Sequence, residues 1–275
     1  MENNKEYQKW LEVVEKDGLE LENVPEQFRT EKLCEAALDN NANAFEFVPE
    51  ELKTQELCEI YVSACGWNLQ YVPKDLRTKE MCEFAVKDFG WALEYVPEEL
   101  KTREFCEFAV KEHGSALEFV PLELITPELC ELAIKGVLGQ GGNLKFVPYE
   151  LRTKKLCELA VEKNGRNLEF VPEDLNTQEM CEIAVSQGFG ASQTLQYVPD
   201  KFKTYDICKI ALEENGYSLK YVPEELKTYD MCKIAVKDYP RALEYVPEEL
   251  KTQELCAIAL KQKGSTLEFV PVEFK

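Results

Sequence analysis

The strongest constraint on this chain is a Val-Pro dipeptide that recurs at an almost fixed spacing. Its eleven prolines stand at 25, 49, 73, 97, 121, 148, 172, 199, 223, 247 and 271. The spacing is 24 residues, with two exceptions of 27, from 121 to 148 and from 172 to 199. A fixed period of roughly 20 to 50 residues is typical of stacked units, each too small to bury its apolar face alone. The sequence therefore predicts a single repeat domain over residues 1–275.

Each repeat opens on a threonine that directly precedes an apolar stretch, as Thr54 does. A threonine at a helix N-cap accepts a hydrogen bond from a free helix N–H, which stabilises the helix by about 1 kcal/mol. Glycines such as Gly66 and Gly90 follow where the helix must stop. The remaining piece ends before Val-Pro, because the residue before a proline avoids the α region. The capping threonines stand at 30, 54, 78, 102, 126, 153, 177, 204, 228 and 252.

This pattern predicts an all-α solenoid of about eleven units, each with one α-helix and one short α or 3₁₀ segment. We expect it to wind as a right-handed superhelix. In residues 1–29 the cysteine position is taken by Trp10, and Tyr7, Trp10, Leu11 and Val14 make a single apolar face. A terminal unit needs only one buried face, so we expect 1–29 to cap ten cysteine-containing repeats over 30–275. No polar cap follows the last Val-Pro, so a partner either covers that end or the final helix tolerates exposure.

The two signatures Leu-Cys-x-x-Ala-Val and Leu-x-Tyr-Val-Pro-x-x-Leu resemble those of short bihelical solenoid repeats. Two classes are similar: the leucine-rich repeat variants, and a related bacterial and viral repeat family with no assigned function. The resemblance covers nearly the whole chain. It implies an α-solenoid with a binding role, and it carries over no catalytic residues.

Ten of the eleven cysteines hold one repeat position, at 34, 58, 82, 106, 130, 157, 181, 208, 232 and 256. Successive helices in a stack lie about 8–10 Å apart, too far for a zinc site or a disulfide between equivalent cysteines. We therefore interpret them as small buried hydrophobes and expect neither a metal nor a cofactor. Cys65, beside Gly66, lies outside the register and is the candidate exposed thiol, although we favour its interpretation as an inert loop residue.

The sequence predicts a non-enzymatic protein in a reducing compartment such as the cytoplasm. It holds no phosphate-binding loop, zinc-protease motif or nucleophile elbow, and its one histidine, His113, falls in an inter-helix turn where we expect exposure. Many cysteines are compatible with a cytosolic chain only as free thiols. Residues 1–9 are polar, unlike a signal peptide, and no apolar run of about 18 residues exists, so we expect no membrane association.

The net charge of the chain and its distribution indicate which kind of partner the protein binds. The chain has 52 acidic and 32 basic residues, a formal charge of −20, which argues against nucleic acid and anionic membranes as partners. Residues 1–200 carry −19 of this and residues 201–275 carry −1. The residue after the core cysteine is acidic at Glu59, Glu83, Glu107 and Glu131, which predicts an acidic ridge. Lysines four residues after the last three would neutralise part of it, so a solvated face that serves solubility is the leading interpretation of the ridge, with partner binding as the alternative.

Aromatic residues at positions that vary between repeats are further candidates for partner binding. Trp67, Trp91 and Tyr217 follow the helix-ending glycine, and Tyr205 and Tyr229 follow the capping threonine. Tryptophan and tyrosine are enriched at binding hot spots, although the tryptophans could equally lie flat as part of the core. The two 27-residue repeats carry insertions within 135–142 and 186–193 that could form binding loops or tolerated drift.

These observations favour a repeat scaffold that binds a protein partner carrying basic groups. One alternative is an acidic mimic of nucleic acid that occupies a DNA- or RNA-binding protein. The other is a structural or self-assembling rod, which leaves the oligomeric state open between a monomer and end-to-end association.

Overall fold

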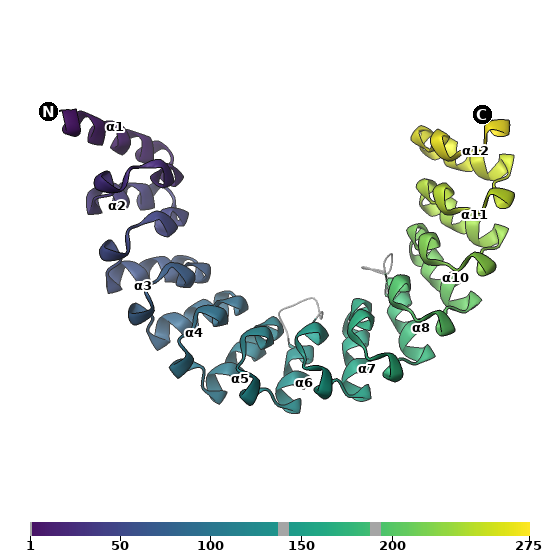
Figure 1. Ribbon diagram of the computed structural model, residues 1–275, viewed down its shortest axis with the longest axis horizontal. Coiled ribbons are helices and arrows are strands. Elements are labelled where there is room, and N and C mark those ends of the chain that lie inside the picture. Colours follow the sequence, from purple (N-terminus) through teal and green to yellow (C-terminus); the bar gives the residue numbers. More distant parts are fainter. Residues whose placement is uncertain (1, 137–142, 188–193) are drawn as a thin grey trace. The chain divides into compact units, whose positions relative to one another are not determined.

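The computed structural model describes residues 2–136, 143–187 and 194–275, and within these ranges the chain is helical with no β-strand. This confirms the predicted all-α repeat fold (Figure 1). The chain divides into two compact units, Met1–Leu138 (unit 1) and Gly139–Lys275 (unit 2). Both units are built from the same repeat. That they form a single repeat domain stays a prediction, and so does the right-handed superhelix. No helix in the described ranges is both long and apolar enough to cross a membrane.

Unit 1 holds six α-helices and ten 3₁₀-helices. The α-helices are α1 (Glu2–Lys16), α2 (Glu31–Asn40), α3 (Gln55–Ala64), α4 (Lys79–Asp88), α5 (Arg103–Glu112) and α6 (Pro127–Lys135). The 3₁₀-helices are η1 (Gly18–Asn23), η2 (Glu26–Phe28), η3 (Ala42–Phe47), η4 (Glu50–Leu52), η5 (Gly66–Tyr71), η6 (Lys74–Leu76), η7 (Gly90–Tyr95), η8 (Glu98–Leu100), η9 (Gly114–Phe119) and η10 (Leu122–Leu124). These counts refer to the described part of the unit.

Unit 2 repeats this order over its described residues. Its α-helices are α7 (Lys154–Lys163), α8 (Gln178–Ser186), α10 (Tyr205–Glu214), α11 (Tyr229–Asp238) and α12 (Gln253–Gln262). Its 3₁₀-helices are η11 (Asn143–Phe146), η12 (Tyr149–Leu151), η13 (Gly165–Phe170), η14 (Glu173–Leu175), η15 (Leu195–Tyr197), η16 (Asp200–Phe202), η17 (Gly216–Tyr221), η18 (Glu224–Leu226), η19 (Pro240–Tyr245), η20 (Glu248–Leu250), η21 (Gly264–Phe269) and η22 (Val272–Phe274).

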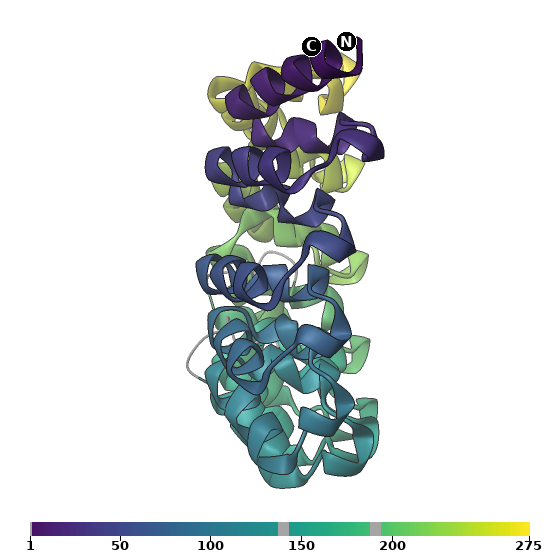
Figure 2. The same cartoon turned by 90° about the vertical axis from the view of Figure 1, so that its left-hand side faces the viewer.

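Each α-helix is thus followed by two 3₁₀ segments, one more than predicted. The first, such as η7, ends at an extended residue before the proline, as expected for Val96 (φ −68°, ψ 131°). The second, such as η8, forms because the Pro-Glu-Glu-Leu turn itself winds into a single 3₁₀ turn. In unit 1 the α-helices line one side of the stack and these turns line the other (Figure 2).

The predicted threonine caps are confirmed at nine of the ten positions. In each, the hydroxyl accepts a hydrogen bond of 3.2–3.3 Å from the backbone N–H three residues on, as Thr54 does from Leu57. The prediction is wrong for Thr30, whose side chain makes no cap bond. Its Oγ1 instead lies 3.2 Å from the Tyr7 hydroxyl of the N-terminal helix, so the capping unit diverts it.

Glycine is needed at these positions for a different reason from the predicted one, which was to end the helix. No glycine in the described ranges has a positive φ, and Gly66 opens the next 3₁₀ segment instead of ending the helix. A side chain at Gly66 would place its Cβ 2.7 Å from the Ala85 carbonyl oxygen of the following helix. Gly165 stands against Ala184 in the same way. Glycine is therefore required by close packing of one repeat against the next.

The interior confirms the interpretation of the cysteines. All eleven are free thiols, and the ten in register are at most 2% exposed. Burial raises the pKa of these thiols, to about 11 for Cys34 and about 12 for Cys82. They are buried as small hydrophobes in the interior of the stack.

We call the residue directly before each capping threonine a bridging residue, because five of them donate a hydrogen bond to a carbonyl of the next repeat: Arg29, Lys53, Arg77, Arg152 and Lys227. Arg77 donates from Nε to the Val72 carbonyl (2.8 Å), from Nη2 to that of Gln70 (3.3 Å), and from Nη1 to that of Tyr95 in the next repeat. Lys53 and Lys227 reach the equivalent next-repeat carbonyls at 2.9 Å. Ile125 and Asn176, which precede the two 27-residue repeats, are the non-basic bridging residues.

The two ends of the described chain differ in how their repeats are covered. Helix α1 packs on α2 with Val14 fully buried, which fits a capping unit with a single apolar face. In the final repeat Leu267 is 47% exposed, although its equivalents in the other described repeats are buried. Nothing lies within 4 Å of a Cβ built on Gly264, so this chain leaves that face of the last repeat uncovered.

Candidate interaction surface

The outward face of the unit 1 helices carries the predicted acidic ridge. Glu59, Glu83 and Glu107 are exposed, whereas Glu131 is half-buried and lies 2.6 Å from the Lys135 ammonium. The other predicted lysine pairs are wrong. Glu83 pairs with Lys79, on the preceding turn, at 3.5 Å, and Glu107 has no ion pair among the described residues. The ridge is therefore less neutralised than the spacing of lysines predicts.

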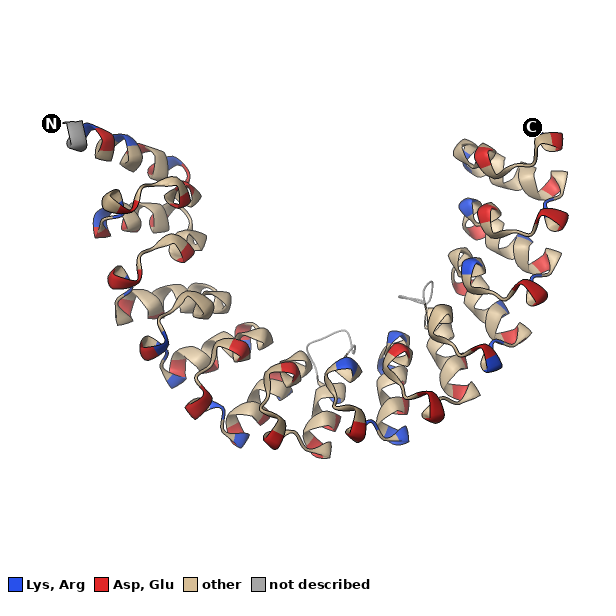
Figure 3. Cartoon of the chain, viewed as in Figure 1, with Lys and Arg blue, Asp and Glu red and all other residues tan. Residues whose placement is uncertain are grey.

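The same position in unit 2 is still glutamate in the first two repeats (Glu158 and Glu182), changes to a paired lysine in the next two, and is Ala257 in the last. Lys209 lies 3.8 Å from Glu213, and Lys233 lies 2.7 Å from Glu254 of the next repeat. Hydrogen bonds from Lys233 and Tyr229 lower the pKa of Glu254. Over whole units, residues 1–138 hold 30 acidic and 14 basic side chains (−16), and residues 139–275 hold 22 and 18 (−4). Figure 3 marks the acidic positions in red and the basic positions in blue along the ribbon of each unit.

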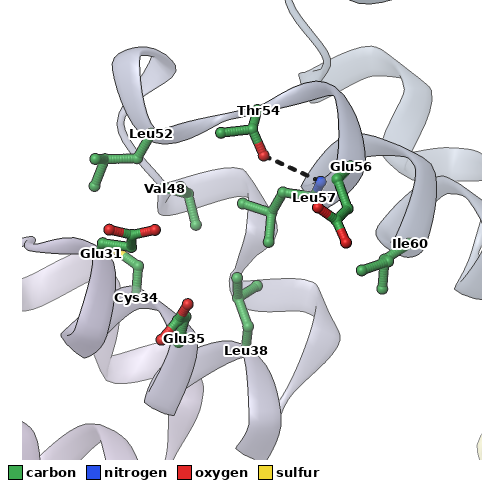
Figure 4. A pocket seen from close by; sticks show the side chains of 10 residues that line it. All are labelled: Glu31, Cys34, Glu35, Leu38, Val48, Leu52, Thr54, Glu56, Leu57 and Ile60. Atoms are coloured by element: carbon green, nitrogen blue, oxygen red, sulfur yellow. Dashed lines mark hydrogen bonds between the residues drawn. The ribbon is translucent and has the colours of Figure 1, made fainter.

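A groove of about 270 Å³ opens on this face between α2 and α3 (Figure 4). Val48, Leu38, Leu57 and Ile60 line its apolar part, with Leu52 and Cys34 beside them. Glu31 and Glu35 of α2 lie on one side and Glu56 of α3 on the other. No lysine or arginine lines it, and none of the three glutamates has an ion pair within the described residues.

The groove exists because three residues of this junction differ from the repeat. Tyr61 occupies a position where the other nine cysteine-containing repeats have alanine. Phe45 replaces a leucine found in the ten other units, and Ala42 replaces the packing glycine. The Phe45 and Tyr61 rings stack with centroids 5.4 Å apart. These larger side chains hold α2 and α3 apart, and the backbones of α2 and α3 approach each other less closely than those of the other successive α-helices of unit 1.

Two further features show that this junction is open. The Gly66 N–H donates to Asp88 of the following helix at 2.8 Å, and Gly18 and Gly216 make the same bond to Asn40 and Asp238. At the α2–α3 junction the repeat position of these acceptor side chains is taken by Ala64, whose methyl group accepts no hydrogen bond. Leu57 is half-buried, although its nine equivalents are at most 7% exposed. The floor of the groove is therefore apolar surface that the other repeats cover.

The predicted tryptophan pair is present as a larger cluster. Trp67 and Trp91, 38% and 42% exposed, do not pair directly, because Phe89 lies between them with its centroid 5.1 Å from Trp67 and 6.2 Å from Trp91. Tyr95 and Phe119 extend the cluster, which we call the unit 1 aromatic edge. Sequence reasoning missed Phe89, although an aromatic residue directly before a packing glycine was visible.

Unit 2 has an equivalent aromatic edge that holds its own cation. Tyr217 contacts Tyr221, Tyr239 and Tyr245 at centroid distances of 5.7–6.0 Å. The Lys220 ammonium lies 5.5 Å from the Tyr221 centroid and 3.3 Å from the Tyr217 hydroxyl. In unit 1 the residues at the position of Lys220 are Glu22, Glu46, Gln70, Glu94 and Glu118.

The other two predicted tyrosines differ in their surroundings. Tyr205 is exposed, as predicted. Tyr229 is half-buried, because its hydroxyl donates to Glu254 of the next repeat at 3.0 Å and Lys233 lies over its ring. Tyr205 therefore stays a predicted contact residue, whereas Tyr229 bonds to the next repeat.

The single histidine and the odd cysteine are both half-buried. His113 is half-buried, not exposed as predicted, because its ring covers Gly90 and its Nε2 lies 3.0 Å from the Lys87 carbonyl. A carbonyl only accepts, so Nε2 carries the proton. Cys65 is half-buried. The described residues hold no group of three potential metal ligands. Most of both predicted insertion loops, at 137–142 and 188–193, lies outside the described residues.

Comparison with known proteins supports the repeat architecture. No curated protein matches the chain. One family matches it six times in overlapping stretches, at residues 10–53, 30–77, 54–101, 78–125, 177–227 and 229–275. The matches follow the threonine-to-threonine boundaries of the repeat, which confirms a repeat protein, whereas a link to leucine-rich repeat variants stays a prediction. Since these stretches cover most of its length, the chain belongs to the family described as a domain of unknown function, DUF4116.

Proposed function

We propose that the protein is a non-enzymatic repeat scaffold that binds another protein, and that unit 1 engages basic groups of this partner. The observation that carries the proposal is the pairing of charges on the helix faces. In unit 1 Glu31, Glu35, Glu56 and Glu107 face outward without an ion pair among the described residues, whereas the unit 2 lysines at the ridge position are paired. Unpaired charge on a surface steers and selects a partner of opposite sign.

The chemistry of the side chains supports a binding role over a catalytic one. Burial raises the pKa of the core thiols, which keeps them protonated and far from the reactive thiolate form. The ring nitrogen Nε2 of His113 is engaged by a backbone carbonyl. Free thiols throughout the chain fit a reducing compartment, which we propose as the site of action.

The aromatic edge of unit 1 supplies the second contact in this proposal. Trp67, Phe89 and Trp91 form a contiguous exposed aromatic surface, and such surfaces are typical of binding hot spots. Glu94 and Glu118 occupy the position that Lys220 takes in unit 2. A basic side chain of the partner would therefore find both rings and carboxylates there.

Affinity capture on the immobilised full chain, followed by purification of the captured protein and a salt titration of its binding, tests this proposal. We expect the affinity to fall steeply with ionic strength and to weaken at least about tenfold in the variant W67A/W91A. An affinity indifferent to salt would overturn the electrostatic part. Release of the captured partner by duplex DNA would instead favour the nucleic-acid mimic, and end-to-end association of the purified chain on sedimentation would favour the rod.

A further inference from the structure

We infer that the groove between α2 and α3 receives an arginine side chain of a partner protein. The inference rests on the proposed function and narrows it to one site and one residue type. The groove combines an apolar floor, which the rest of the stack covers in other repeats, with three carboxylates that have no ion pair of their own in the described residues.

The apolar floor fits the stem of a long basic side chain. Leu38 and Val48 are buried, Leu57 is half-buried and Ile60 is 52% exposed, so the groove runs from the interior to the surface. Lysine and arginine bury their methylene stems along apolar surface while the charged head stays at the rim. Burial of a stem there removes the apolar area of Leu57 and Ile60 from water.

The carboxylates select the charge of the head. Glu31 and Glu35 approach from α2 and Glu56 from α3, so a head group at the rim lies between acids of two helices (Figure 4). A guanidinium is planar and forms paired hydrogen bonds with carboxylates, and it sheds water more readily than an ammonium. For these reasons arginine fits the groove better than lysine.

Methyl NMR titration of the full-length chain tests the inference directly. The probes are N-acetyl-L-arginine N-methylamide and its citrulline counterpart, which has the same shape without the charge. The arginine probe shifts the methyl signals of Leu38, Leu57 and Ile60, and the citrulline probe binds about tenfold or more weakly. Equal binding of the two probes, or no shift of these methyl signals with the arginine probe, would overturn the inference.

Removing the carboxylates tests the rim. The variant E31Q/E35Q/E56Q weakens arginine-probe binding about tenfold, because each exposed pair contributes up to about fivefold. The matched variant E104Q/E107Q/E128Q changes the charge of unit 1 equally at α5 and α6, away from the groove, and leaves binding at the Leu57 methyl unchanged. An equal loss in both variants would mean a general electrostatic effect and would contradict the site.

Restoring the repeat consensus tests the groove itself. The variant A42G/F45L/Y61A gives this junction the glycine, leucine and alanine of its neighbours, so it closes the groove without breaking the repeat pattern. Circular dichroism reports that it is folded, and the arginine probe no longer shifts Leu57. A folded variant that binds the probe like the original chain would overturn the inference. So would failure of this variant to fold, because the closed junction would then be incompatible with the chain.

The experiments distinguish a failure of the arginine-site inference from a failure of the proposed scaffold function. If the partner captured by the full chain binds A42G/F45L/Y61A with unchanged affinity, the groove is not its site and the scaffold proposal stands. If the arginine probe binds the groove as described but no basic partner is captured, the scaffold proposal fails and the groove remains an arginine site.

Discussion

In unit 1 the position after the core cysteine carries glutamate in all five repeats, whereas in unit 2 it carries glutamate only in the first two repeats (Glu158 and Glu182), then lysine in Lys209 and Lys233 and alanine in Ala257. The aromatic edges differ in the same sense. Lys220 sits over the tyrosine rings of unit 2, and Glu94 and Glu118 take its position in unit 1. Beneath these surfaces the two units share the buried cysteines, the threonine caps and the bridging residues. One framework can therefore display two surfaces of different charge, since the residues that build it and the residues that face outward hold separate positions.

Thiol labelling tests whether the two units share the same buried interior. We expect the largest effect in this experiment. An aromatic disulfide reagent modifies Cys65 in the folded chain, and the ten core thiols react roughly a thousandfold or more slowly, because they require local opening. Mass spectrometry of the labelled chain gives the count. Cys65→Ser removes the fast site, and all eleven react in denaturant. Fast labelling of the core cysteines of one unit alone would show that the interiors differ.

Removal of a bridging arginine tests whether both units depend on the same joints. Arg77→Met and Arg152→Met each delete three hydrogen bonds to backbone carbonyls. We expect each to lower the free energy of unfolding by about 2–3 kcal/mol, measured by chemical denaturation. Arg103→Met, at an exposed position without such bonds, is the control and should change little. A large loss in one unit and none in the other would contradict a common framework.

The smallest expected effect concerns the aromatic edges. Gln70→Lys gives the unit 1 edge the cation that Lys220 supplies in unit 2. We expect a gain in unfolding free energy of about 0.5 kcal/mol and a blue or intensity shift of the fluorescence of Trp67. Lys220→Gln should lose a similar amount. The comparison of the two edges would be wrong if neither substitution changed stability or fluorescence.

The regular part of the fold was predictable because the same local sequence pattern recurs in every repeat. The threonine caps, the buried cysteines and the end of each 3₁₀ segment at Val-Pro all follow from local chemistry repeated ten times. The prediction failed at Thr30, since its neighbour is the capping helix and not another repeat. It also misread Gly66, because the reason for this glycine lies in a helix 19 residues away.

The candidate groove was not predicted, although its signal is in the sequence. Tyr61 in a column of alanines and Phe45 in a column of leucines mark one junction as different. What sequence reasoning lacks is the knowledge that these two columns face each other across the junction, which the ring stacking supplies. The bridging residues were missed similarly, because their acceptors lie one repeat further on.

We propose that the basic partner binds at the carboxylates of unit 1 and is not held simply by the net negative charge of the chain. Two full-length variants with the same net charge test it most directly: E59Q/E83Q/E107Q in unit 1 and E214Q/E225Q/E249Q, at exposed positions in unit 2. The measurement is the affinity of each for the captured partner at low and physiological salt. The account predicts that the unit 1 variant binds about tenfold more weakly with a shallower salt dependence, while the unit 2 variant binds like the original chain. Equal weakening in both variants would contradict it.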